Sequence, residues 1–555
     1  MNRTMHRSLV ALVALAAVVQ AIVLFRFEVN WDEFLNLSMV YDYHRGDLRE
    51  ILQTAFIHFF HWVPYVSVNE VDQVIAARML IAVFALATSW AIWASARQLT
   101  SPEGALFAVL AYWTFSYVLR HGLSLRTDTL AAAPIMVALW LALTRGGQIR
   151  AVALAGALIG FAGVMTIKAI FFVPTIVVIG SVRALETRSL RGAFGLLVLA
   201  GTVALGTFAL LIGLHALTFS EFNSPLAFLE RTTQATLADT AKNIFFVSGI
   251  QAIANNPVHV GLLFAALAAV VGTLVKNGNR QQGIVGSALL FPLLIPLIYR
   301  DMYPYFFTLV LPPVAIAIAI GYDSYTKAHS RTWLLFGSLC LFWAFGTANA
   351  LLQPNTHQRQ ILSVIHQTFP ADSRYISGRS TVSSLRHRGL FMSSWGMDNY
   401  RAANEPVMRG ELEKGAPAFL LADDYKLQLG QITPESSGKN RSGLLPEDLR
   451  VLQANFVPFW GPIWIPGRKI SEGTSEIEIF SAGTYVNRGP GTLIIDGNAV
   501  LPDKEVTLTA GVHSAKATEA TEIAVQYARP AAPPPPPVFQ GFLHSPVLDY
   551  LKSPQ

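Results

Sequence analysis

The sequence is poor in charge and almost free of cysteine. Only 14% of its 555 residues are charged, whereas 52% are hydrophobic, and the mean hydropathy is +0.43. So few charges exclude an ordinary soluble globular protein and predict a polytopic membrane protein. Cys340 is the single cysteine, so a disulfide framework is excluded. It lies in an apolar run. The chain also lacks a Walker-type phosphate loop, a G-x-S-x-G element and a paired C-x-x-C. Its net charge of +6 is modest, and no nucleic-acid partner is expected.

Long apolar stretches are abundant instead. A membrane-spanning helix needs about 20 apolar residues, and about eleven stretches qualify. They are 8–26, 74–97, 102–119, 127–144, 149–166, 168–185, 192–217, 257–275, 283–299, 305–322 and 332–351. The first resembles a signal peptide, but its length and the spans that follow favour an uncleaved helix. The sequence therefore predicts a polytopic α-helical membrane domain over residues 1–351.

The composition turns polar from Leu352 onward. Residues 352–470 mix helical stretches with short apolar strands and predict a soluble α/β domain. Residues 471–528 are rich in strand patterns, and Asp496-Gly497 is a strong hairpin signal. Residues 529–555 are rich in proline and are expected to be a poorly ordered tail.

Basic residues set the expected orientation. One set of connections between the spans carries a row of basic residues that, with Arg3 and Arg7, fits the positive-inside rule: Arg97, Arg145, Arg150, Arg183, Arg188, Arg191, Lys276, Arg280, Lys327 and Arg331. Because cytoplasmic loops are enriched in these residues, the N-terminus is predicted to be cytoplasmic and the C-terminal domain to lie outside the membrane.

The outer loop 27–73 is expected to lie at the membrane surface. Apolar residues fall at helical spacing between Leu52 and Val63 and predict an amphipathic helix in the interface plane. Residues 31–44 predict a second interfacial helix. The alternative is an ordinary helical loop packed on the membrane domain. Either arrangement keeps an acid pair, Asp32 and Glu33, near the bilayer surface.

Cations on the outer face are the second chemical signal. Arg120, Arg126, Lys168 and Arg300 lie at span ends on the side where Lys and Arg should be scarce. Each alone has a second explanation as a snorkelling anchor, but together they indicate an anion site, because Arg and Lys are the usual partners of phosphate. Asp128 follows Arg126 at the top of a span, where an acid is costly and commonly functional. Its alternative role is to neutralise Arg126.

Acids beside cations suit one reaction class. An acid acts as general base on an acceptor hydroxyl, while cations stabilise a departing phosphate. Polyprenyl-phosphate sugars are donors with such a leaving group. A transporter or flippase of lipid-linked glycans is the alternative, although the charges cluster at one surface and no internal repeat is visible.

Four features in order along the chain resemble one family. Asp32-Glu33 after the first span, Leu125-Arg-Thr-Asp128, Thr166-Ile-Lys168, and Tyr299-Arg-Asp-Met-Tyr-Pro-Tyr305 before Leu311-Pro-Pro313 match the layout of GT-C class glycosyltransferases. The resemblance covers the membrane domain. It is greatest to the bacterial branch related to protein O-mannosyltransferases and to the lipid A aminoarabinose transferase.

The resemblance implies roles for individual residues. Asp32 would be the general base, supported by Glu33, and Asp128 the second acidic position. Lys168 matches the lysine of the family's Thr-Lys-Gly element, with Ile167 inserted and Ala169 in place of the glycine. The remaining implied donor-site residues are Arg126, Arg300, Tyr303 and Tyr305.

The resemblance also implies partners and a location. The donor would be a polyprenyl-phosphate sugar, the acceptor a lipid such as lipid A, a glycan or a protein, and the reaction would invert the anomeric centre. A bacterial inner membrane is expected, with the C-terminal domain in the periplasm. Some relatives need a divalent cation and others do not; with three acids and no firm histidine partner, no required metal is expected. His58 and His61 supply two ligands, which do not make a site.

Overall fold

The computed structural model describes residues 3–226, 256–275, 280–295, 299, 303–328, 332–439 and 443–534. The chain divides into two compact units. The membrane unit comprises Met1–Phe27, Asp42–Val63 and Ile75–Pro354, and the C-terminal unit comprises Glu28–Tyr41, Pro64–Val74 and Asn355–Gln555. Two pieces of the predicted outer loop 27–73 are thus grouped with the C-terminal residues.

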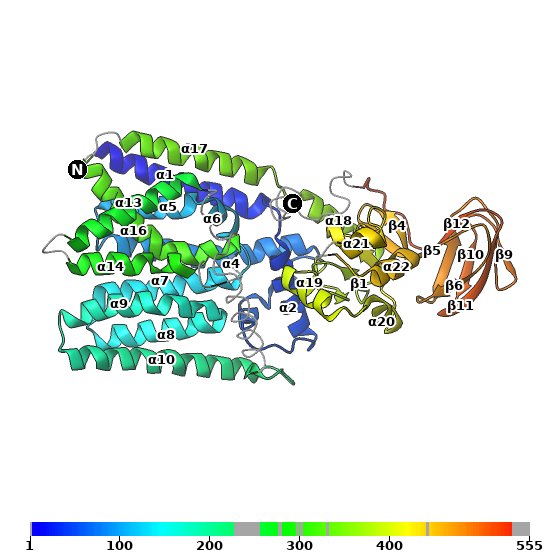
Figure 1. Ribbon diagram of the computed structural model, residues 1–555, viewed down its shortest axis with the longest axis horizontal. Helices are drawn as coiled ribbons and strands as arrows, with labels where there is room; N and C mark the ends of the chain where they lie inside the picture. The colour runs from blue at the N-terminus through cyan, green and yellow to red at the C-terminus, as the bar shows by residue number, and fades with distance from the viewer. Residues whose placement is uncertain are drawn as a thin grey trace. The chain divides into compact units, whose positions relative to one another are not determined.

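The membrane unit is helical (Figure 1). Its α-helices are α1 (Arg3–Arg26), α3 (Ile57–Phe60), α4 (Glu70–Ala96, from Ile75 on), α5 (Pro102–Thr114), α6 (Ser116–His121), α7 (Thr127–Arg145), α8 (Ile149–Met165), α9 (Val173–Leu185), α10 (Leu190–Ala216), α13 (Pro257–Val275), α14 (Arg280–Leu290), α16 (Phe307–Ala328) and α17 (Thr332–Leu351). Its 3-10 helices are η1 (Val63–Tyr65, which runs on past the unit), η2 (Ile167–Phe172), η3 (Phe291–Leu294) and η4 (Pro304–Phe306).

Eight helices of the described residues are long and apolar enough to cross a membrane. The chain is therefore a polytopic membrane protein with a β-rich C-terminal region. The other three predicted spans correspond to shorter helices, α5 with 13 residues, α8 with 17 and α14 with 11. The total of about eleven spans stays a prediction.

Helix α10 shows why these helices need a lipid environment. Only 6% of its most apolar window is buried within the protein. Leu190, Phe194 and Leu205 are 76%, 67% and 73% exposed, although they are large and apolar. Contiguous apolar surface of this kind is unstable in water and is satisfied by acyl chains.

Helices α8 and α10 approach closely because α8 carries two glycines one turn apart. A methyl group at Gly156 would lie 2.5 Å from the carbonyl oxygen of Ala200, and one at Gly160 would lie closer still to that of Ala204. Small residues spaced by four are the usual means of close packing between helices in a bilayer.

This contact predicts the effect of a single methyl group. Gly160→Ala should lower the free energy of unfolding by about 1–3 kcal/mol, since the backbone of α10 must move away. Thermal unfolding in detergent measures the change. Gly195→Ala on α10 is the matched control, because nothing lies within 4 Å of its added methyl. Equal behaviour of the two variants would refute the close-packing explanation.

The predicted amphipathic helix over Leu52–Val63 is largely wrong. The segment contains only α3 and the start of η1, and Gln53 adopts a left-handed backbone with φ 62°, which interrupts a helix. Its apolar residues are nevertheless inside: Phe56, Phe60 and Val63 are at most 1% exposed. These apolar residues are therefore packed within the membrane unit, as expected for a loop packed on the membrane domain.

The predicted span 102–119 is divided. Ser101 caps α5 by accepting from the Gly104 N–H, and the helix ends where Phe115 turns extended (φ −67°, ψ 128°). The N–H of Ser116, the first residue of α6, is satisfied by Asn256 Oδ1 at 3.0 Å. This break leads through a short turn to the start of α7, where two of the predicted site residues lie.

The C-terminal unit begins with α2 (Trp31–His44, up to Tyr41), which confirms the helix predicted over 31–44. Its other helices are α18 (Thr356–Thr368), α19 (Ser394–Ala403), α20 (Met408–Glu413), η5 (Tyr425–Leu427), α21 (Pro434–Lys439) and α22 (Pro446–Asn455). Its strands are β1 (Arg374–Ser377), β2 (Arg386–Arg388), β3 (Phe419–Leu421), β4 (Phe456–Trp460), β5 (Ile463–Ile470), β6 (Gly473–Ile479), β7 (Gly483–Asn487), β8 (Leu493–Ile495), β9 (Asn498–Val500), β10 (Glu505–Leu508), β11 (Gly511–Ala517) and β12 (Thr521–Val525).

These strands form two sheets. The larger has the order β10-β7-β12-β5-β3-β1-β2, with β4 paired to β5, and the smaller has the order β6-β11-β8-β9. Strands β2, β1 and β3 are parallel, and β5 joins them antiparallel. Because β12 pairs with β5, strands on the two sides of the predicted boundary at 470/471 share the larger sheet.

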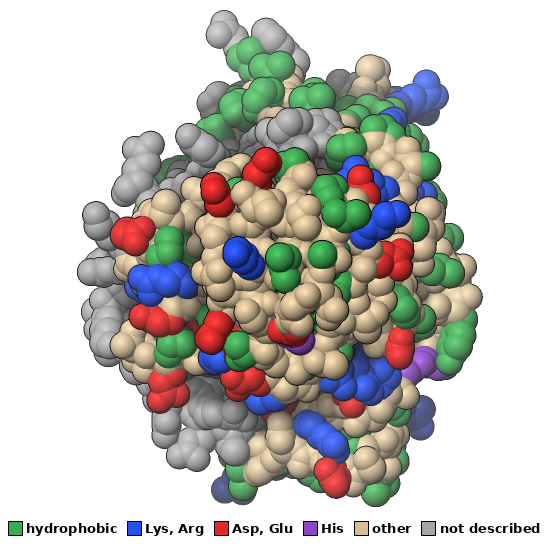
Figure 2. Space-filling model, turned by 90° about the vertical axis from the view of Figure 1, so that its right-hand side faces the viewer, with side chains coloured by type: hydrophobic (Ala, Val, Ile, Leu, Met, Phe, Trp, Pro, Cys, Tyr) green, Lys and Arg blue, Asp and Glu red, His purple; other side chains and the backbone are tan. Residues whose placement is uncertain are grey.

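The hairpin predicted at Asp496-Gly497 is confirmed. It joins β8 to β9, and its two residues have φ of 51° and 83°, as a tight hairpin turn requires. On the side of the molecule drawn at the right of Figure 1, acidic and basic side chains are interspersed (Figure 2). Mixed charge of this kind is typical of a solvated surface.

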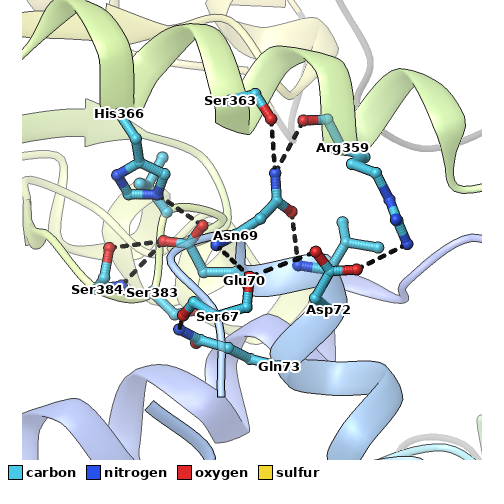
Figure 3. A network of polar contacts seen from close by, with 12 residues as sticks. Ser67, Asn69, Glu70, Asp72, Gln73, Arg359, Ser363, His366, Ser383 and Ser384 are labelled. Carbon is cyan, nitrogen blue, oxygen red and sulfur yellow. Dashed lines mark hydrogen bonds and ion pairs between the residues drawn. The ribbon is translucent and has the colours of Figure 1, made fainter. Parts of the chain in front are cut away.

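A polar network anchors the segment that leads into α4 (Figure 3). Glu70, which is fully buried, accepts from His366 Nε2 at 2.8 Å and from Ser384 Oγ at 2.6 Å. Asn69 Nδ2 donates to the Arg359 carbonyl at 2.9 Å, and the Arg359 guanidinium pairs with Asp72 at 2.9 Å. The network joins the segment to α18 and to the loop before β2.

The network predicts a dependence of stability on pH. Burial opposes protonation of His366, but its hydrogen bond to Glu70 and the charge of Glu70 raise its pKa above the usual 6.5. The stabilisation is therefore fully present below pH 6.5 and is lost as the pH rises through the raised pKa. Thermal unfolding should shift down between about pH 6 and about pH 8. His366→Gln should reduce this shift, and an unchanged shift would show that another group causes it.

Candidate functional site

Five of the residues predicted for the site lie together in the membrane unit. They are named here the Arg126 cluster: Arg126, Asp128, Lys168, Tyr303 and Tyr305. Each lies where a helix begins or ends, because the backbone there is free to turn side chains toward one another. Arg126 is the extended residue before α7, and Asp128 lies in the first turn of α7, where the helix dipole favours an acid.

Lys168 and Asp128 form an ion pair. Lys168 Nζ lies 3.0 Å from Asp128 Oδ2 and 3.1 Å from Oδ1, with side-chain exposures of 14% and 3%. Lys168 reaches this position because Thr166 ends α8 in an extended conformation and η2 follows. The ion pair of Asp128 is thus with Lys168, which answers the question that the sequence left open about its partner.

The cations of the cluster also face aromatic rings. The Arg126 guanidinium carbon lies 3.4 Å from the centre of the Tyr305 ring, and Lys168 Nζ lies 4.9 Å from that of Phe306. Tyr303 stacks on Tyr305 with ring centres 5.7 Å apart. Such contacts contribute from about 0.5 to about 2 kcal/mol each and fix the orientation of a cation without neutralising it.

Two neighbours of the cluster were not predicted from the sequence. Phe306 is fully buried beneath Lys168, and Gln53 Oε1 accepts from Thr166 Oγ1 at 3.4 Å. Phe306 follows Tyr305 directly and was detectable as part of the same motif. Gln53 was not, because nothing in the local sequence signals its left-handed backbone.

The acid pair lies in the C-terminal unit, in the first turn of α2. Asn30 Oδ1 accepts from the Asp32 N–H at 3.0 Å, and Glu33 Oε2 accepts from the Asn30 N–H at 3.0 Å. This reciprocal arrangement is a capping box, with asparagine as the cap. Glu33, which is fully buried, therefore holds the start of the helix, and Asp32 is 9% exposed.

The remaining predicted site residues are not joined to the cluster by the structure. Arg300 lies outside the described residues. Asp32 and Glu33 belong to a different compact unit from the Arg126 cluster, and their convergence with it stays a prediction.

Among the described residues no group of three or more His, Cys, Asp or Glu side chains is arranged to hold a metal. His58 Nε2 instead lies 2.8 Å from His215 Nδ1, and His61 Nδ1 lies 3.0 Å from the His58 carbonyl oxygen. The expectation that no metal is required, with a divalent cation possible, stays a prediction.

Comparison with solved structures finds several membrane glycosyltransferases. The oligosaccharyltransferase AglB of Archaeoglobus fulgidus, in complex with an inhibitory peptide and a dolichol-phosphate, is 10% identical with a TM-score of 0.47 over 95% of this chain and 97% of that chain. ArnT of Cupriavidus metallidurans, bound to undecaprenyl phosphate, is 18% identical with a TM-score of 0.41 over 60% and 62%. The arabinosyltransferase EmbB of Mycobacterium smegmatis is 12% identical with a TM-score of 0.41 over 94% and 63%.

The sequence itself matches one family model. No curated protein matches the chain. Residues 66–213 match the family described as dolichyl-phosphate-mannose-protein mannosyltransferase. The matched stretch contains Arg126, Asp128 and Lys168. Over these residues, the match confirms the resemblance of this chain to the GT-C class of membrane glycosyltransferases.

Proposed function

We propose that the protein transfers a sugar from a polyprenyl-phosphate donor to an acceptor of the cell envelope, at the outer face of a bacterial inner membrane. The observation that supports this most is the Arg126 cluster. It places two cations, one acid and two stacked tyrosines at helix ends within or next to the family-matched residues. The acceptor is lipid A or lipopolysaccharide, a polysaccharide or a protein.

The cluster suits a departing phosphate. Arg126 and Lys168 place two cationic side chains beside each other at this site, with the Asp128 carboxylate bound to Lys168. Arginine offers a planar fork and lysine a point charge to phosphate oxygens. Since both are held in place before substrate arrives, they stabilise the developing charge without reorganisation. Arg300 is proposed as a further cation of this site.

Asp128 acts on this site through Lys168. With an exposure of only 3%, its carboxylate is poorly placed to take a proton from a bulky acceptor, but it fixes the Lys168 ammonium from two oxygens. We therefore assign Asp128 the orientation of Lys168. The stacked rings of Tyr303 and Tyr305 would border the donor headgroup.

The acid pair would serve the acceptor. The acceptor hydroxyl oxygen attacks the anomeric carbon, the bond from that carbon to the phosphate oxygen breaks, and the hydroxyl proton passes to Asp32. Polyprenyl phosphate leaves with the bonding electrons, and the anomeric centre is inverted. Glu33, at the capping box, holds the turn that presents Asp32.

Product analysis separates this reaction from transport of a lipid-linked glycan. Purified protein in liposomes, supplied with polyprenyl-phosphate sugars and extracts of the envelope, should release polyprenyl phosphate only when acceptor is present. Movement of the intact donor across the bilayer without its cleavage would support a flippase instead. Mass spectrometry of envelope lipids from cells that lack the protein would then identify the acceptor.

A further inference from the structure

The turn that carries the acid pair is held by residues more than 300 positions later in the chain. Both backbone groups of Val29 bond to one side chain of α18: the Val29 N–H donates to Gln358 Oε1 at 2.7 Å, and Gln358 Nε2 donates to the Val29 carbonyl at 2.8 Å. Gln358 is 1% exposed. This paired contact fixes the chain two residues before α2 begins.

A second contact fixes Trp31, the first residue of α2. The Arg379 guanidinium carbon lies 4.7 Å from the centre of the Trp31 ring, and Phe391 packs on the same ring with centres 5.7 Å apart. The guanidinium is itself oriented, because its Nε and Nη2 atoms each lie 2.8 Å from Asp424 Oδ2. Lys426 Nζ holds the other oxygen of Asp424 at 2.9 Å.

A third contact lies on the far side of the same turn. Ser383 Oγ donates to the carbonyl oxygen of Phe34 at 2.7 Å, and both residues are fully buried. The next residue, Ser384, bonds to Glu70 at the start of α4 (Figure 3). Two adjacent serines thus hold two separate segments of the C-terminal unit: Ser383 holds Glu28–Tyr41, and Ser384 holds Pro64–Val74.

The sheet explains why these groups gather. Arg379 and Ser383 follow β1, and Asp424 follows β3, and parallel strands bring their carboxyl ends to one edge. The two loops touch so closely that a methyl group at Gly378 would lie 2.7 Å from Asp424 Cβ. Ser380 keeps a left-handed backbone with φ 49°, a strained conformation for serine.

We propose that this edge is a positioning device for the acid pair, and that Arg379 is its principal residue. The proposal rests on the proposed function, in which Asp32 is the general base. Arg379 does not touch substrate: it holds the Trp31 ring, and the ring sets the direction of the turn that presents Asp32. Ser383 and Gln358 hold the same turn through its backbone.

The test separates positioning from binding. Trp31→Leu removes the ring without disturbing the ion pair of Asp424, whereas Arg379→Gln leaves Asp424 without that partner and puts the fold of the loop at risk. A misplacement of about 1 Å can cost about 100-fold in rate. We expect Trp31→Leu to lower kcat at least tenfold with the KM for donor unchanged, and Trp31→Phe to restore most of the rate.

A structural measurement accompanies the kinetics. Hydrogen exchange of amides in residues 29–38 should accelerate in Trp31→Leu and in Arg379→Gln, and the double variant should lose little more rate than either single variant. Arg409→Gln is the matched control, an exposed arginine of the same unit paired with Glu413 and Glu478. It should change neither exchange nor kcat.

The outcomes distinguish this proposal from the proposed function. If Trp31→Leu keeps normal kcat while Asp32→Asn is inactive, positioning is refuted and the general base stands. A raised donor KM with unchanged kcat would assign Trp31 to substrate binding and also refute positioning. If Asp32→Asn transfers sugar normally, the proposed function itself fails, whatever the Trp31 variants do.

Discussion

Replacement of Asp32 by asparagine is expected to lower sugar transfer by at least about 100-fold, the lower limit for loss of a general base. The substitution keeps the volume of the side chain and cannot accept the acceptor's proton. The helix start should survive, since Asn30 caps the Asp32 backbone N–H rather than its side chain. The rate of release of polyprenyl phosphate under saturating donor measures the effect.

Two further variants test whether the effect is specific to Asp32. Asp42→Asn lies further along α2 and removes an acid that pairs with Arg45 at the surface, so it should leave the rate unchanged. Glu33→Gln retains a side chain that can still complete a capping box and should keep more activity than Asp32→Asn. If Glu33→Gln were the inactive variant and Asp32→Asn the active one, Glu33 rather than Asp32 would be the general base.

The second large effect concerns the ion pair of the Arg126 cluster. Lys168→Met would leave the Asp128 carboxylate buried without its ammonium partner. Loss of one member of a buried pair costs about 3–5 kcal/mol of unfolding free energy. The double variant Lys168→Met/Asp128→Asn should recover most of this stability, because no charge is then left unpaired. Its affinity for the donor should stay low, since the phosphate has lost Lys168.

Thermal unfolding and donor binding test this prediction when both are measured on the wild type, Lys168→Met, Asp128→Asn and the double variant. Lys414→Met is the control, because Lys414 is 65% exposed and its pair with Glu411 lies at the surface. Surface substitutions of this kind usually change stability by less than about 0.5 kcal/mol. Two single variants whose losses simply add in the double variant would mean that Lys168 and Asp128 do not stabilise each other. Normal donor binding by the double variant would show that Lys168 does not bind the donor.

The sequence predicted local structure better than the partners of individual side chains. The helix from Trp31 and the hairpin at Asp496-Gly497 were predicted correctly, since caps and turn residues act over a few positions. The helix over 52–63 was predicted wrongly, because Gln53 adopts a left-handed backbone that interrupts it. The apolar residues of this segment are nevertheless buried, as their spacing predicted.

The site divides in the same way. Charges at span ends were sufficient to select Arg126, Asp128 and Lys168, because each is costly where it lies. The choice of Lys168 as the ion-pair partner of Asp128 required the fold, since 40 residues separate them. Val29 and Gln358 are 329 residues apart, and Phe34 and Ser383 are 349 residues apart. No sequence pattern predicts contacts over such separations.

That separation has a consequence for biosynthesis. When Phe34 leaves the ribosome, the serine that will hold its carbonyl lies 349 residues behind it. At about 5–20 residues per second, translation needs roughly 20–70 s to deliver that serine. During that interval the nascent chain gains its membrane helices but not the contacts that orient Asp32. Under the positioning proposal, a polypeptide stalled before residue 383 would be inserted in the bilayer yet unable to consume its lipid donor.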